Sequence, residues 1–175
     1  MVLKSCHFCP AEAGAGGNGN REETMEEFRL SSPAFGEQQR IPEKYTCEGE
    51  DVSPPLRIEN VPQGAKSLAL VLEDPDAPHG TFIHWTLWNV NPRMTSLEEK
   101  AEPRESVCGK NSWGHNRYGG PCPPSGTHHY QFRLYALDTG LELPGGATRD
   151  QLEDAMDGHI LGIARLTGLY AKKGN

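Results

Sequence analysis

The sequence predicts a single β-rich domain preceded by a short tail. The chain has 175 residues, a length that suits one domain with its own core. Its 20 glycines and 14 prolines together exceed average usage and predict many turns. Apolar or aromatic runs at 67–73, 81–90 and 129–137 have the length and boundaries of strands. These observations favour an all-β or mixed β-rich fold over a helix bundle.

The domain is expected to cover residues 25–175. Residues 1–24 are rich in glycine, alanine, asparagine and glutamate, offer little to bury, and predict a flexible tail. Cys6 and Cys9 make a C-x-x-C pair there, but a Gly- and Asn-rich stretch follows, with neither further zinc ligands nor a βαβ unit. We therefore interpret the pair as incidental to the tail.

The first elements are short and the third is central. A strand is expected near Phe28, and another at 41–47 before a loop that closes at Pro54-Pro55, because proline pairs restrict the backbone to extended or turn shapes. The run SLALVLE at 67–73 is almost unbroken in apolar residues and is bounded by glycine and proline. This pattern predicts a buried central strand.

TFIHWTLWNV at 81–90 predicts the next strand, because aromatic and β-branched residues favour strands. Successive side chains of a strand alternate between its two faces. One face is then expected to carry Phe82, His84, Thr86 and Trp88. The other is expected to carry Ile83, Trp85 and Leu87. Both faces hold large apolar groups, so the strand is expected to lie between two layers.

The remaining elements follow a long connection. Residues 91–125 are polar and rich in turn residues, and a loop of that length in a small domain is often functional. HYQFRLYAL at 129–137 predicts a strand. Thr148, with glutamine three residues later, makes a capping-box pattern that predicts a short helix ending at Gly158. A last strand is expected at 160–171.

Charge and hydropathy exclude several classes of function. The chain has 24 acidic and 17 basic residues, so its net charge is −7, which argues against nucleic acid as a partner. No stretch reaches the roughly 18–20 apolar residues of a membrane span. No apolar run of about 7–15 residues follows Lys4 as in a signal peptide. A cytoplasmic location is therefore expected, and the odd count of five cysteines predicts free thiols rather than disulfides.

Three groups of residues could carry chemistry. Asp74 and Asp76 flank a proline at the end of the buried strand, where they could face a ligand or accept backbone N–H groups in a structural turn. His84 interrupts an apolar strand, which fits either a ligand contact or a hydrogen-bonded core group. The Gly- and Pro-rich loop 119–128 could surround an anion with backbone N–H groups, or form ordinary turns.

Three segments occur in an order and spacing typical of one known family. They are SPPL at 53–56, DPDAPHGTFIHW at 74–85 and YGGPCPPSGTHHYQFRLYALD at 118–138. These segments resemble the signature motifs of the phosphatidylethanolamine-binding protein family, in its bacterial and archaeal, Raf kinase inhibitor-like branch. The resemblance runs from about Phe28 to Tyr170. It implies an all-β-dominated β-sandwich with Greek-key-like topology, one or two short helices and an anion-binding pocket at one end.

The resemblance also implies which residues line that pocket. The implied ligand-binding residues are Asp74, Asp76, Pro78, Phe82, His84, Gly120, Pro121, His128 and Tyr130. His128 and Tyr130 share strand parity and could project together. The chain departs from the family at His129, where arginine is usual. By alternation His129 is expected to point away from the pocket, with loss of an outer ion pair rather than of ligand binding.

These residue types suit a small anionic ligand. Imidazole N–H groups can donate to phosphate oxygens, and a carboxylate favours the charged form of a neighbouring imidazole and can bind an ammonium group. The three tryptophans are expected to serve packing. We therefore predict a non-enzymatic binding module for phosphate-bearing head groups, with no cofactor and no metal. The resemblance adds a protein kinase or protease as a regulated partner, and a homodimer.

Two alternatives use the same residues. Asp74, His84 and His128 could act as a general acid–base set or, with a metal ion, as a hydrolase, although no H-E-x-x-H spacing is present. Cys122 could be a nucleophile beside a histidine, but its proline neighbours disfavour this. Alternatively, the acids and imidazoles form a buried polar network that only holds loops together. Loss of His128 would then lower the melting temperature without changing ligand affinity.

Overall fold

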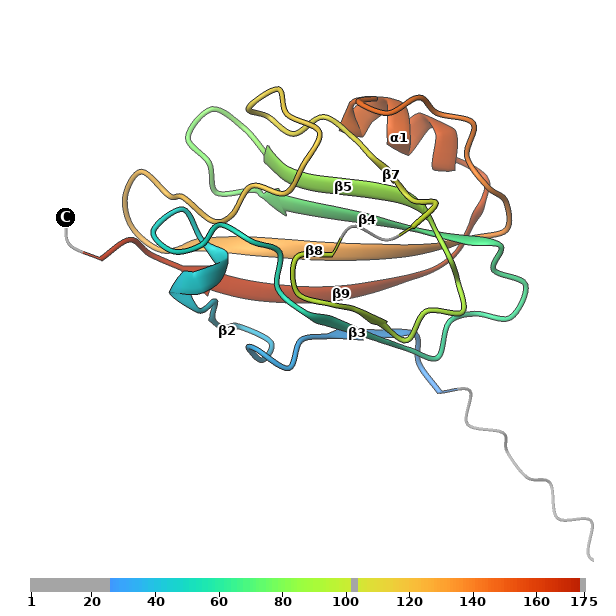
Figure 1. The fold of residues 1–175 in the computed structure, drawn as a ribbon, viewed down its shortest axis with the longest axis horizontal. Coiled ribbons are helices and arrows are strands. Elements are labelled where there is room, and N and C mark those ends of the chain that lie inside the picture. Colours follow the sequence, from blue (N-terminus) through green and yellow to red (C-terminus); the bar gives the residue numbers. More distant parts are fainter. Residues whose placement is uncertain (1–25, 102–103, 174–175) are drawn as a thin grey trace, which may run out of the picture.

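The computed structural model describes residues 26–101 and 104–173, so the predicted tail at 1–24 and the Cys6/Cys9 pair lie outside the described residues. Within them the chain forms two β-sheets and one α-helix (Figure 1). The larger sheet contains, in spatial order, β2 (Gln39–Arg40), β9 (Ile160–Tyr170), β8 (His128–Leu137), β4 (Ser67–Asp74), β5 (Phe82–Val90) and β7 (Val107–Cys108). The smaller sheet contains β1 (Arg29–Ser31), β3 (Leu56–Glu59) and β6 (Ser96–Leu97). The helical segments are the 3₁₀ turn η1 (Glu43–Tyr45) and the helix α1 (Arg149–Met156).

Neighbouring strands of both sheets are antiparallel, except that β2 runs parallel to β9. Strands β4, β5, β8 and β9 are the long ones and make the body of the larger sheet (Figure 1). All eight residues of β4 are buried, which confirms the central strand that its apolar run predicts. Strand positions predicted for β5, β8 and β9 agree with the structure to within one residue at each end.

The hydrophobic core forms two layers, one on each face of the larger sheet. The first layer lies against the smaller sheet and includes Leu30, Leu56, Leu97, Leu70, Trp85, Leu87, Phe132 and Leu166. The second lies beneath α1 and includes Ala69, Val71, Trp88, Tyr135, Leu152 and Met156. The predicted position of β5 between two layers is therefore confirmed, since Trp85 belongs to one layer and Trp88 to the other.

Helix α1 begins and ends where the sequence predicts. The Thr148 side chain accepts a hydrogen bond from the backbone N–H of Gln151, and the Gln151 side chain accepts one from the backbone N–H of Thr148. This reciprocal pair satisfies N–H groups that the first turn leaves free. Gly158 follows the helix with a φ of 76°, a conformation that glycine adopts without steric cost.

The strand predicted at 41–47 is wrong. Strand β2 ends at Arg40, and Pro42 is followed by the 3₁₀ turn, in which the N–H of Tyr45 donates to the carbonyl of Pro42. Pro42 has no backbone N–H to donate to a neighbouring strand, so the strand cannot continue through it. Ile41 is fully buried in the core instead.

Strands β3, β6 and β7 are absent from the prediction. Strands β6 and β7 have two residues each and lie within the segment 91–125, which is predicted to be one polar loop. Strand β3 follows Pro54-Pro55 with the alternating exposure of Leu56–Glu59, too short a pattern to be recognised alone. The finer description implied by the resemblance, a β-sandwich with Greek-key-like topology and an end pocket, stays a prediction.

Strand β5 does not alternate regularly between its faces. Leu72 and Glu73 of β4 pair with Trp85 and Ile83, so His84 is an extra residue opposite them, a β-bulge. Ile83 then lines a cavity with residues of α1, whereas Trp85 belongs to the core under the smaller sheet. A second shift occurs near Asn89, which has a φ of 56°.

The predicted grouping of the β5 side chains is wrong for this reason. The Phe82 and His84 rings lie together near Tyr130, whose ring belongs to the core under the smaller sheet. Thr86 and Trp88 lie on the opposite face, close to Gly109. A bulge moves every later residue of a strand by one position, so period-2 reasoning fails across it.

The prediction that all cysteines are thiols is also wrong. Cys47 and Cys122 form a disulfide with a Cα–Cα distance of 5.5 Å, and Cys108 takes no part in a disulfide. A count of cysteines cannot reveal which two of them meet across 75 residues of chain. Disulfides are rare in cytosolic proteins, so the cysteines of this chain do not support the predicted cytoplasmic location. None of the described helices has the length and apolarity to cross a bilayer.

Candidate functional site

A cavity of about 430 Å³ lies between the connection that joins β4 to β5 and the loop that carries Trp113. Four of the predicted ligand-binding residues line it, namely Asp74, Pro78, Phe82 and His84. In Figure 1 the β4–β5 connection and the start of β8 lie at the same end of the larger sheet. Strand ends therefore bring together residues that are more than 50 positions apart in the chain.

His84 is the most tightly held of these residues. Its side chain is only 3% exposed, and its Nδ1 lies 2.8 Å from the carbonyl oxygen of Gly119. A carbonyl can only accept, so Nδ1 carries the proton and Nε2 of the neutral ring is an acceptor. Burial lowers the pKa of His84, while the Gly119 carbonyl and the charge of Asp74 oppose that shift. At neutral pH His84 is therefore a neutral imidazole with a fixed tautomer.

Asp74 is paired with His128 rather than with His84. The Asp74 Oδ2 atom lies 2.7 Å from His128 Nδ1, and both side chains are buried. The Oδ1 atom of Asp74 accepts the backbone N–H of Asp76, which closes a turn. His128 is thus oriented by the carboxylate of Asp74, a residue that also lines the cavity.

Tyr130 connects the two histidines, which confirms the predicted common face of His128 and Tyr130. Its ring lies 5.2 Å from the His84 ring in an edge-to-face arrangement and 6.5 Å from the His128 ring in a stacked one. The side chain is fully buried, and burial and the nearby Asp74 carboxylate raise the pKa of Tyr130. Tyr130 is therefore a neutral phenol at any physiological pH.

Asp76 faces away from this group. Its Oδ2 atom accepts the backbone N–H of His129 at 2.8 Å and lies 2.7 Å from His129 Nδ1, and the His129 and Asp76 side chains are 47% and 41% exposed. The bonds from His129 lower the pKa of Asp76. His129 points outward, as alternation predicts, and its ring makes a hydrogen bond to Asp76; the expected loss of an outer ion pair stays a prediction.

Gly120 and Pro121 pack against the loop at 45–51 and are not among the described residues that line this cavity. The Gly120 N–H donates to Asp51 Oδ1 at 2.6 Å, and a Cβ at this position would lie 2.8 Å from the Thr46 Cα. The Pro121 carbonyl accepts the N–H of Cys47. The glycine is required for close approach between two loops, and its predicted contact with a ligand stays a prediction.

Trp113 lies at the cavity, whereas only a packing role is predicted for it from the sequence. It is 44% exposed, lines the cavity, and its ring lies 4.6 Å from that of Phe82 and 5.1 Å from that of His84. Only the polar surroundings of this tryptophan in a long loop signalled a role other than packing. Asn111, which is buried, organises that loop by accepting the Trp113 and His115 N–H groups with its Oδ1.

Ligand donors for a metal ion do not converge in this region. In the described parts of the chain, no group of three or more His, Cys, Asp or Glu side chains is arranged to hold a metal ion. The arrangement instead offers an aromatic mouth formed by Phe82 and Trp113, one imidazole acceptor and one carboxylate. These groups can bind a polar ligand with both charged and apolar parts.

Comparison with known proteins gives one consistent result. The family model of the phosphatidylethanolamine-binding proteins matches residues 31–171. A UPF0098 protein of Pyrococcus abyssi is 49% identical over 156 residues, which cover 85% of this chain and 88% of that protein. A UPF0098 protein of Methanothermobacter thermautotrophicus is 51% identical over 150 residues, covering 83% and 99%.

Solved structures agree in fold. The crystal structure of a putative phosphatidylethanolamine-binding protein homologue from Chlamydia trachomatis has a TM-score of 0.81 and 44% identity, and covers 84% of this chain and 99% of that one. The crystal structure of YbcL of Escherichia coli, described as a member of the mammalian family, has a TM-score of 0.79 and 30% identity with the same coverage. The chain belongs to the phosphatidylethanolamine-binding protein family.

Proposed function

We propose that this protein is a non-enzymatic binding module whose cavity at His84 and Asp74 takes a small ligand with a phosphate-bearing head group. The observation that carries the proposal is a buried imidazole of fixed tautomer that lines a cavity of about 430 Å³ together with a carboxylate and two aromatic rings. The cavity size is in the range of small-molecule sites. The UPF0098 relatives carry names that state no activity.

Each part of such a ligand has a partner in the cavity. The hydroxyl of Ser112 accepts the N–H of Ile83, which leaves its proton free to donate to an anion. An ammonium group would find the Asp74 carboxylate and the faces of Phe82 and Trp113, which attract cations. Phosphoethanolamine carries both charges and is therefore expected to bind more tightly than inorganic phosphate.

Binding of an anion at His84 requires a proton. The Nε2 atom of neutral His84 is an acceptor, so it repels a fully ionised phosphate. A hydrogen bond forms only if the phosphate carries a proton and donates it, or if Nε2 is itself protonated and donates to the phosphate. Either route places one additional proton in the complex. Because burial lowers the pKa of free His84, anion binding is expected to strengthen as the pH falls from 7.5 to 5.5, by up to about tenfold per pH unit for one linked proton.

Isothermal titration calorimetry with phosphate and phosphoethanolamine tests the proposal. His84→Asn keeps a donor for the Gly119 carbonyl but removes the titrating ring, and it is expected to weaken both ligands about tenfold or more. The matched control is His159→Asn, because His159 pairs with Asp138 on the surface. Titration in two buffers of different ionisation enthalpy counts the proton that is taken up.

Several outcomes would contradict the proposal. The proposed binding function is contradicted if neither phosphate nor phosphoethanolamine binds wild-type protein at millimolar concentration. It is also contradicted if His84→Asn and His159→Asn bind these ligands equally well. Turnover of p-nitrophenyl phosphate that disappears in His84→Asn would replace it with the hydrolase alternative. A lower melting temperature in His128→Asn with unchanged affinity would support a purely structural polar network. A kinase or protease partner, a homodimer and a cytoplasmic location stay predictions that rest on the resemblance and on composition.

A further inference from the structure

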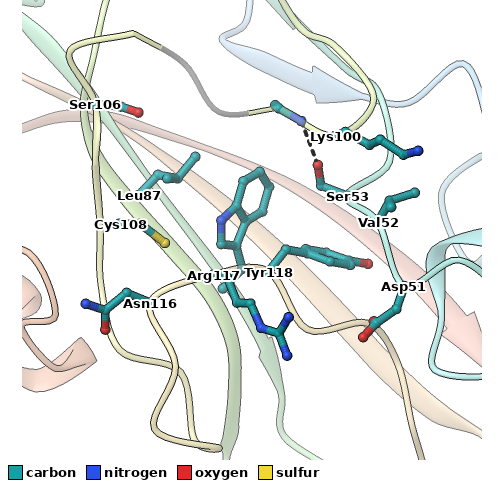
Figure 2. A pocket seen from close by; sticks show the side chains of 12 residues that line it. Asp51, Val52, Ser53, Leu87, Lys100, Ser106, Cys108, Asn116, Arg117 and Tyr118 are labelled. Atoms are coloured by element: carbon teal, nitrogen blue, oxygen red, sulfur yellow. Dashed lines mark hydrogen bonds between the residues drawn. The ribbon is translucent and has the colours of Figure 1, made fainter.

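A second cavity, of about 480 Å³, lies on the face of β5 that is turned toward the smaller sheet (Figure 2). Its floor is made by Trp85 and Leu87 of β5, and its walls include Val52, Tyr118 and Cys108. None of the residues that line it also lines the cavity at His84. The two cavities are therefore separate sites on one molecule.

The apolar part of this second cavity is pre-formed. The rings of Trp85 and Tyr118 meet edge to face with centroids 5.5 Å apart and planes at 87°. The Tyr118 hydroxyl donates to the Tyr45 carbonyl at 2.7 Å, which holds the ring in place. Trp85 is only 2% exposed and Leu87 3%, so packing fixes both, and the apolar surface that a ligand can touch includes the half-buried Val52 and Tyr118. A rigid aromatic and aliphatic surface of this kind suits a planar apolar group.

Among the described residues that line this cavity, two are basic and one is acidic, although the chain carries a net charge of −7. Arg117 and Lys100 both line it. Arg117 makes no ion pair with any residue in 26–101 or 104–173, and Lys100 pairs only with the exposed Glu50 at 3.4 Å. The acidic residue of the lining, Asp51, already accepts the Gly120 N–H at 2.6 Å. An unpaired guanidinium at a cavity mouth is complementary to a carboxylate.

We propose that this cavity binds a small planar aromatic carboxylate, with its ring against Tyr118 and Val52, above the buried Trp85 and Leu87, and its carboxylate at Arg117. The apolar floor and the unpaired cation are both needed, because a neutral ring would leave Arg117 without a partner and a bare anion would leave the floor unfilled. The volume admits a ligand of about two fused rings. The site is independent of the ligand proposed for the His84 cavity.

Naphthalene-2-carboxylate is the probe, and its uncharged amide, naphthalene-2-carboxamide, is the matched ligand. The three tryptophans report on different places: Trp85 lines the second cavity, Trp113 lines the His84 cavity, and Trp88 belongs to the core beneath α1. In ¹H–¹⁵N spectra the indole resonance of Trp85 is expected to shift on addition of the carboxylate. The Trp113 resonance, assigned with a Trp113→Phe variant, is expected to stay in place.

The variant Arg117→Gln removes the cation while keeping most of the side chain. It is expected to weaken the carboxylate about tenfold and to leave the affinity for the carboxamide unchanged. Arg93→Gln makes the same change of net charge at an exposed position outside this cavity and is expected to bind like wild type. The proposal is overturned if the carboxylate does not bind at millimolar concentration, if it shifts Trp113 instead of Trp85, or if Arg117→Gln and Arg93→Gln behave alike.

Discussion

His84 illustrates how one residue is defined by what surrounds it. The ring lies among Phe82, Trp113 and Tyr130 and uses Nδ1 on the Gly119 carbonyl, so it is desolvated and fixed in one tautomer. Its neutral state is a consequence of burial, which disfavours the charged form. Because the folded protein holds His84 in its neutral form, acid is expected to lower the free energy of unfolding.

The fold is therefore expected to lose stability as the pH falls below about 6.5, the ordinary pKa of histidine. Because burial lowers the pKa of His84 in the folded protein, the unfolded chain takes up the proton first. One such proton lowers the free energy of unfolding by at most about 1.4 kcal/mol per pH unit. Urea unfolding between pH 7.5 and 5.5 measures this, and His84→Asn is expected to show a shallower pH dependence than wild type. Parallel curves for the two proteins would show that His84 does not carry the effect.

His129 shows the limit of reasoning from alternation. Strand parity correctly places its side chain outside the cavity. Parity says nothing of a partner that arrives from another strand end, and Asp76 lies 2.7 Å from its ring. A histidine in place of arginine therefore keeps the contact between β8 and the β4–β5 connection, and its two bonds lower the pKa of Asp76.

At the scale of elements, the loop that carries Gly119 and Gly120 is held from two sides. The carbonyl of Gly119 accepts from His84, and the N–H of Gly120 donates to Asp51. One residue further, the Pro121 carbonyl accepts the N–H of Cys47, and Cys122 is joined to Cys47 by the disulfide. The disulfide thus reinforces a junction between the loop at 45–51 and the wall of the His84 cavity, which Cys122 lines.

Removal of this disulfide is expected to destabilise the protein by about 2–4 kcal/mol, because it closes a long loop in the unfolded chain. The double variant Cys47→Ser/Cys122→Ser, studied by urea unfolding with and without dithiothreitol, measures the cost. Wild type should lose stability in the reductant, whereas the double variant should be insensitive to it. Cys108→Ser is the control and should respond to the reductant as wild type does, since its disulfide is intact. A wild-type protein that is indifferent to the reductant would contradict the expectation.

At the scale of the whole molecule, one buried acid connects the larger sheet to the helix. Glu73 of β4 is 3% exposed, and its Oε1 lies 2.9 Å from Arg133 of β8 while its Oε2 lies 3.6 Å from Arg149 of α1. Both arginines are about 30% exposed at the side chain and therefore remain partly hydrated. The acid thus ties together three elements on the face that α1 covers.

Glu73→Gln is expected to lower the free energy of unfolding by about 2–3 kcal/mol, since it leaves two partly buried guanidinium groups without their shared carboxylate. Glu153→Gln is the matched control. Glu153 lies 2.8 Å from the same Arg149 but is 37% exposed, and exposed pairs contribute less than about 1 kcal/mol. Urea unfolding at low and at high salt compares the two. Equal losses in the two variants would show that burial of Glu73 does not decide its contribution.

Local patterns in the sequence predicted most of the larger sheet and the helix. An unbroken apolar run marks β4, aromatic and β-branched residues mark β5 and β8, and the Thr148/Gln151 capping box marks α1. These features depend on neighbours within a few positions, so they can be read without the fold. The two-residue strands β6 and β7 and the bulge at His84 have no such local pattern.

By itself the sequence determined the fold class, the positions of the long strands along the chain and the residue types available for a site, because side-chain periodicity and capping are local properties. Only the tertiary structure decided that His128 rather than His84 pairs with Asp74, that Trp113 stands at the cavity mouth, and that Cys47 meets Cys122. Each of these contacts joins residues from different strand ends or loops. Their distances depend on how whole elements pack, and no short-range pattern records that.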